Sequence, residues 1–144
     1  TECMTGLEQF GAYMTKLLTL DTFFLNEDRH THNIAVLMDG AGKFRYCPIF
    51  DNGAGLMSDT AMDYPMNEKV EVLQKRVTPK TFCVDFEEQL DIAEELYGQQ
   101  IQFRFQQEDV WNLLQQENYY SREVKERVAH IILEQQRKYQ YLFL

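Results

Sequence analysis

The sequence predicts a single, mainly α-helical domain that carries one small β-hairpin. Three observations predict this fold class. Apolar residues recur at helical spacing in several segments, two short apolar runs flank a glycine-containing turn, and no linker or repeat divides the 144 residues. A chain of this length is typical of a single domain and is long enough to bury a hydrophobic core. We therefore treat residues 1–144 as one domain.

The first predicted helix runs from about Gly6 to the region 20–24. Its apolar residues recur at helical spacing, namely Leu7, Phe10, Met14, Leu17 and Leu18. Two apolar, partly β-branched runs follow at 34–37 and 44–49. The sequence Asp39-Gly40-Ala41-Gly42 separates them and is a strong hairpin signal. Gly53 and Gly55 then allow the chain to turn sharply as it leaves the hairpin.

The second half of the sequence predicts further helices. Residues 55–66 indicate a loop, and a short helix is expected over about 68–76. Asp85 followed by Glu88 is typical of a capping box, which begins a helix that Gly98 would end.

Two more helices complete the predicted fold. One is expected over 108–116, and the last begins at Ser121, whose hydroxyl can cap it. One face of that last helix is apolar, with Val124, Val128, Ile131 and Ile132.

The stretch with the clearest chemistry is Asp28–Asn33, followed after the hairpin by Asp51–Gly53. Phosphoryl transfer needs a carboxylate to orient the attacking hydroxyl, and an amide and a second carboxylate to hold Mg²⁺ on the triphosphate. Asp28, Asn33 and Asp51 fit these roles in that order. Folding the hairpin brings Asn33 and Asp51 to its open end, where both side chains can hold one cation.

These motifs resemble the HipA-like bacterial protein kinases over residues 20–59. The matching letters are Asn26-x-Asp28-x-His30-x-x-Asn33 and the run 48–53, Pro-Ile-Phe-Asp-Asn-Gly. Asp-Arg-His-x-x-Asn is also similar to phosphatidylinositol-kinase-like catalytic loops. The resemblance implies the C-terminal lobe of a protein-kinase-like fold, an α+β parent fold, in a cytoplasmic kinase that uses ATP and Mg²⁺ to phosphorylate Ser or Thr of a protein.

The resemblance also implies roles for the matching residues. Asp28 is the candidate catalytic carboxylate, and His30 lies in the same catalytic loop. We expect His30 to hold the loop by hydrogen bonds, with proton handling as the alternative. Asn33 and Asp51 are the candidate metal and nucleotide ligands. Arg29 can brace the loop by pairing with a carboxylate.

No segment indicates the small lobe of a kinase. A kinase small lobe has a glycine-rich loop that covers the phosphates and a lysine on a strand that pairs with them. Gly53 and Gly55 follow Asp51, so they are not that loop, and Lys16 lies on the first predicted helix and not on a strand. We expect the chain, which begins at Thr1, to be a fragment or a half that depends on another polypeptide. By itself it should have little or no activity.

Composition excludes several function classes. The formal net charge of −9 and scattered basic residues argue against contact with nucleic acid or anionic membranes. No run approaches the roughly 20 apolar residues of a membrane span. The aromatic residues of 119–120 and 139–143 are expected to pack, not to stack on bases. Cys3, Cys47 and Cys83 lack a metal-type spacing and fit reduced thiols in the cytoplasm.

Two alternatives remain open from the sequence. A divalent-metal hydrolase is suggested by His30-x-His32 between Asp28 and Asp51, but such sites usually need three protein ligands, and the remaining histidine, His130, lies in the last helix. The other alternative is a catalytically silent, kinase-like module that binds a partner.

Overall fold

A computed structural model describes residues 1–144 as a mainly helical fold with one two-stranded antiparallel sheet. The predicted fold class is confirmed at that level. The helices are α1 (Glu2–Thr5), α2 (Phe10–Phe24), α3 (Val70–Gln74), α4 (Phe86–Tyr97), α5 (Gln107–Gln116) and α6 (Arg122–Lys138), with short 3-10 turns at Thr31–Asn33 and Gln140–Leu142. None of the helices combines the length and the apolar character needed to cross a bilayer.

The predicted start of the first long helix is wrong. Gly6, with φ 69°, ends the four-residue α1, and Gln9, with φ 62°, precedes α2. Both residues adopt the left-handed conformation, which interrupts a continuous helix. The apolar spacing that includes Leu7 therefore crosses a break in the chain.

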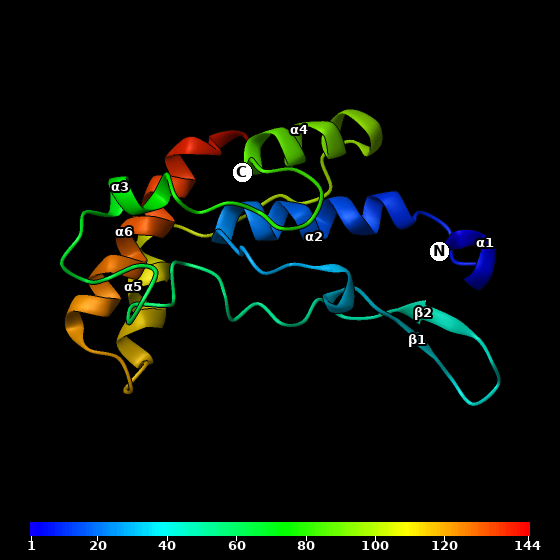
Figure 1. Ribbon diagram of the computed structural model, residues 1–144, viewed down its shortest axis with the longest axis horizontal. Helices are drawn as coiled ribbons and strands as arrows, with labels where there is room; N and C mark the ends of the chain where they lie inside the picture. Colours follow the sequence, from blue (N-terminus) through cyan, green and yellow to red (C-terminus); the bar gives the residue numbers. More distant parts are fainter.

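The hairpin is confirmed, although its strands are shorter than the apolar runs. β1 (Val36–Met38) pairs with β2 (Phe44–Tyr46) in the register Val36 to Tyr46. Asp39 closes the turn, because its Oδ1 accepts hydrogen bonds from the backbone N–H groups of Ala41 and Lys43, both at 2.9 Å. Figure 1 shows the hairpin at one end of the molecule, beside α1 and far from α5 and α6.

The later helices begin and end close to the predicted residues. The Asp85 side chain accepts from the N–H groups of Glu87 and Glu88, and Gly98, with φ 74°, ends α4. Ser121 accepts from the N–H of Val124 at the start of α6. These caps satisfy backbone donors that the first turn of each helix leaves unpaired.

Helix α2 is the central element of the fold, with α4 alongside it (Figure 1). The two helices approach closely at Gly11, where an added Cβ would lie only 2.1 Å from the ring of Tyr97. Helix α6 fixes the other end of α2, because the Gln135 amide donates to the carbonyls of Thr22 at 2.9 Å and Phe23 at 3.2 Å. The end of α2, from which the candidate loop departs, is therefore held in place.

One of the two largest buried apolar clusters lies where α2 meets the C-terminal helices. Its buried members are Phe23, Leu90, Val110, Ala129, Ile132, Tyr139 and Leu142. Phe103 and Phe143 add a short parallel bridge and pack against Phe23. Packing is thus confirmed for Tyr139 and Phe143, whereas Tyr141 is half exposed. Tyr119 and Tyr120 are mostly exposed, so the packing prediction is wrong for that pair.

Candidate functional site

Arg29 is the structural centre of the two predicted motifs. Its side chain is fully buried and forms a doubly hydrogen-bonded ion pair with Asp21 near the end of α2. Arg29 Nε lies 2.9 Å from Asp21 Oδ2, and Nη2 lies 3.0 Å from Oδ1. A planar guanidinium matches a carboxylate in this two-pronged geometry. The expectation that Arg29 braces the loop against a carboxylate is confirmed.

The same guanidinium joins the segments before and after the hairpin. Nη1 donates to the carbonyl of Asn33 at 3.2 Å and to the carbonyl of Phe50 at 2.5 Å. Nη2 also donates to the side-chain oxygen of Asn52 at 2.6 Å. The backbone at Asn33 and the residues on both sides of Asp51 therefore meet at one side chain.

Sequence reasoning missed Asp21, which anchors this network. Asp21 is 2% exposed, and it also accepts a 2.8 Å hydrogen bond from the Asn26 amide. Its signal was available in the sequence, because Asp21 follows Leu17 and Leu18 by four and three residues on the apolar face of the helix. A charged residue at such a position needs a buried partner.

The candidate metal ligands differ in their surroundings. Asn33 is buried, and its Nδ2 donates to the carbonyl of Asp28 at 3.1 Å, which orients the amide within the loop. Asp51 is exposed, and its carboxylate forms no hydrogen bond or ion pair. Asp51 also has φ 56°, a left-handed conformation that is uncommon for residues other than glycine. Strained backbone of this kind concentrates at functional sites.

Asp28 lies at the surface of the loop. Half of its side chain is exposed, and its Oδ1 is 3.7 Å from Nζ of Lys80, which is also exposed. An exposed pair at this separation contributes little to stability. The loop around Asp28 is nonetheless held in place, because Thr81 donates to the carbonyl of Arg29 at 2.8 Å. The carboxylate is therefore presented by a fixed backbone.

His30 holds the 3-10 turn that follows it. Its Nδ1 lies 3.3 Å from the backbone N–H of His32, and its Nε2 lies 3.4 Å from Nδ2 of Asn33. Both neighbours are donors, and a neutral imidazole offers a lone pair on only one nitrogen. These contacts agree with a role in loop structure.

The chain contains no group of three or more His, Cys, Asp and Glu side chains placed to hold one metal ion. His30 and His32 are neighbours, with ring centroids 5.4 Å apart, but His130 lies on α6, 3.5 Å from Glu71. The third ligand that the hydrolase alternative needs is therefore not supplied by His130. The candidate pair Asn33 and Asp51 falls outside this criterion, because one of its two side chains is an amide. Asn33 and Asp51 offer the hard oxygen ligands that Mg²⁺ takes.

Comparisons of this chain with protein-family models, with curated proteins and with solved structures find no match.

Proposed function

We propose that this chain is the C-terminal catalytic lobe of a HipA-like, ATP- and Mg²⁺-dependent protein kinase of the bacterial cytoplasm. One observation carries the proposal. The Arg29 guanidinium brings together the Asp28–Asn33 loop and the Phe50–Asn52 segment, and it reaches the carbonyl of Phe50, 21 positions further along the chain. Such a convergence is what a site needs when one loop supplies the catalytic carboxylate and the other a metal ligand.

Within the proposed site, the residues have separate tasks. Asp51 and Asn33 would hold Mg²⁺, which neutralises the charge of the transferring phosphoryl group. Asp28 orients the hydroxyl of a protein Ser or Thr and accepts its proton. Arg29 holds the two loops in a fixed position relative to each other, and His30 holds the turn between Asp28 and Asn33. A second lobe from the same or another polypeptide completes the nucleotide pocket.

The metal-binding role is tested by Asp51→Ala. In the two-lobed protein we expect this change to abolish Mg²⁺-dependent binding of ATP, as measured by calorimetry. The matched control is Asp63→Ala, since Asp63 is also exposed and forms no hydrogen bond. Unchanged Mg²⁺–ATP affinity in the Asp51 variant would overturn the assignment.

The catalytic role is tested by Asp28→Asn. This change keeps the shape of the side chain and removes its charge, so nucleotide binding should persist. Loss of a positioned general base commonly lowers the rate about a hundredfold to ten-thousandfold. Phosphate transfer to a protein substrate measures the effect. If the two-lobed wild-type protein binds Mg²⁺–ATP but never transfers phosphate, the silent, partner-binding module becomes the better description.

A further inference from the structure

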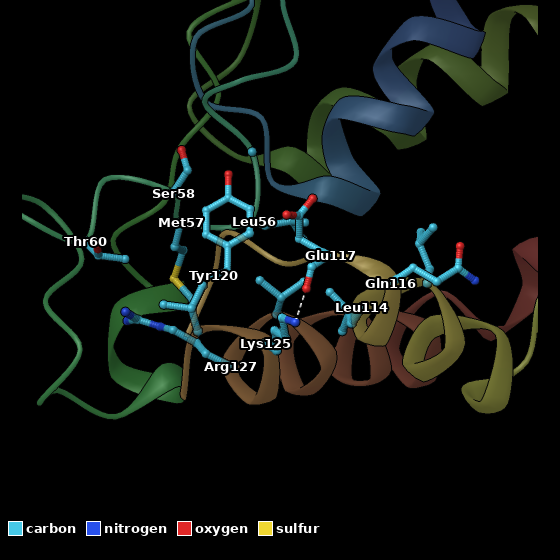
Figure 2. Close-up of a pocket in the computed structure, with 14 residues that line it drawn as sticks. Leu56, Met57, Ser58, Thr60, Leu114, Gln116, Glu117, Tyr120, Lys125 and Arg127 are labelled. Carbon is cyan, nitrogen blue, oxygen red and sulfur yellow. Dashed lines mark hydrogen bonds between the residues drawn. The ribbon is translucent and has the colours of Figure 1, made fainter. Parts of the chain in front are cut away.

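A separate cavity lies between residues 55–60, which follow Asp51–Gly53, and the helices α5 and α6. Its volume is about 640 Å³, within the roughly 300–1,000 Å³ typical of small-molecule sites. Half of its lining is hydrophobic, and Figure 2 shows Met57 and Leu114 in its wall. Val124 and Val128 of α6 also line the cavity. Asp28, Asn33 and Asp51 do not line it, so the proposed kinase site does not account for this cavity.

The charges in the cavity wall are unusual for this chain. Two basic residues, Lys125 and Arg127, line the cavity, together with one acidic residue, Glu117. Lys125 is already engaged, because its Nζ donates to the backbone carbonyl of Glu117. Figure 2 shows Arg127 extending away from this pair, towards the side of Met57 and Thr60. The two ends of the cavity therefore differ in charge: Lys125 and Glu117 lie together at one end, and Arg127 extends to the other.

Arg127 is a buried cation without a carboxylate partner. Its side chain is 7% exposed, and it takes part in none of the ion pairs of the structure. Nη1 donates to the carbonyl of Tyr64 at 2.7 Å and contacts Met66 Sδ at 3.0 Å, whereas Nη2 has only a 3.4 Å contact with Pro65. Nε has no acceptor. Buried charges are normally paired, so this guanidinium has unused capacity for an anion.

The backbone of the facing wall is strained. Leu56 and Met57 are consecutive non-glycine residues with φ 56° and 54°. The strain is fixed by the surrounding structure, because the Leu56 N–H donates to the carbonyl of Phe24 at 2.7 Å and Met57 is 1% exposed. Left-handed conformations of bulky residues persist where the surroundings enforce them, and they cluster at ligand-binding segments.

We propose that this cavity binds an elongated apolar molecule with one carboxylate, such as a medium-chain fatty acid. The carboxylate pairs with the Arg127 guanidinium, chiefly at Nη2, which has the weakest acceptor. The alkyl chain lies against Leu114, Val124 and Val128. This inference is independent of the proposed kinase function, because it uses none of the residues assigned to phosphoryl transfer.

The test measures binding of decanoate to the 144-residue chain by calorimetry, below the concentration at which decanoate forms micelles. We expect saturable one-to-one binding that shifts the NMR signals of Val124 and Val128. Decanol should bind at least about tenfold more weakly, because it lacks the charged hydrogen bonds. Octanoate should bind about fifteenfold more weakly, since two fewer methylenes are buried. Equal affinity for decanol and decanoate, or shifts confined to other surfaces, would overturn the proposal.

Two basic side chains of the same wall provide the matched variants. Arg127→Gln should weaken decanoate at least about tenfold and leave decanol unchanged, whereas Lys125→Gln should change decanoate affinity by less than about threefold. Equal losses in both variants would contradict the assigned position of the carboxylate. If Arg127→Gln does not fold, Val124→Trp tests whether the cavity is the binding site. The larger side chain fills the cavity, so this variant should bind neither decanoate nor decanol. Undiminished decanoate binding by that variant would exclude the cavity as the site.

Discussion

Two arginines are buried to nearly the same degree in this chain, and their surroundings are opposite. Arg29 is paired with the carboxylate of Asp21 through two hydrogen bonds. Arg127 meets only backbone carbonyls and a thioether, and burial lowers its pKa from the usual value. The first arrangement makes a rigid brace between a helix and two loops. The second leaves a cation in a cavity wall, which suits a ligand that brings its own negative charge.

The largest expected effect comes from breaking the paired arrangement. Asp21→Ala leaves Arg29 buried without its counter-charge, so the free energy of unfolding should fall by about 3–5 kcal/mol. Urea unfolding measures this loss. Asp91→Ala is the control, because Asp91 is an exposed aspartate on α4, and it should change stability by less than about 0.5 kcal/mol. A loss below about 1 kcal/mol for Asp21→Ala would mean that the pair is not a brace.

The second prediction separates charge from geometry at Arg29. Arg29→Lys retains the positive charge but cannot reach Asp21, Phe50 and Asn52 together. The two loops would then lose their common anchor. If the proposed kinase function holds, displacement of its catalytic groups by about 1 Å can cost on the order of a hundredfold in rate. Phosphate transfer by the two-lobed protein measures the effect, with exposed Arg45→Lys on β2 as the control. Undiminished turnover in a folded Arg29→Lys protein would show that the brace is dispensable for function.

The fold was predictable where the signal is local. Asp85, Gly98 and Ser121 mark helix ends because their short side chains or free backbone act within one turn. The start of α2 was not predictable from the same information, since Leu7 continues the apolar spacing across the break at Gln9. Apolar periodicity indicates which face is buried, but it does not record a left-handed residue between two helices.

The candidate site was predictable in part for a different reason. Motif letters proposed Asp28, Asn33 and Asp51 as site residues, which stays a prediction, and they suggested that Arg29 has an acidic partner, which the contact with Asp21 confirms. Spacing alone could not identify Asp21 as that partner, because the contact depends on how the loop folds back over the end of α2. The Arg127 cavity was beyond sequence reasoning, since its wall joins residues 55–60 to helices far along the chain.

A third prediction concerns the unpaired arrangement. Arg127→Met replaces a buried, unpaired cation with an apolar side chain of similar length. The lost hydrogen bonds to carbonyls are offset by the removal of a desolvated charge, so the free energy of unfolding should change by no more than about 1 kcal/mol. Arg29→Met, measured in the same urea titration, should lower the free energy of unfolding by several times that amount, because it leaves the buried Asp21 carboxylate without its counter-charge. Similar losses in the two variants would contradict the distinction between the two arginines.

The smallest effect is expected at a second uncompensated charge, the acidic Glu94 of α4. Its Oε1 is buried without a partner, and Oε2 accepts a 3.0 Å hydrogen bond from Tyr141. Burial raises the pKa of this carboxyl, so the folded state favours the protonated form and loses stability as the pH rises through the folded-state pKa. Glu94→Gln removes the charge and can still accept from Tyr141. We therefore expect a small rise in the thermal midpoint at pH 7 that disappears below about pH 4, where glutamate is protonated in both states. Thermal unfolding at the two pH values measures it, with the exposed neighbour Glu95→Gln as the control. A lower midpoint for Glu94→Gln at pH 7 would show that the ionised carboxylate is favourable in the fold, unlike the charge on Arg127.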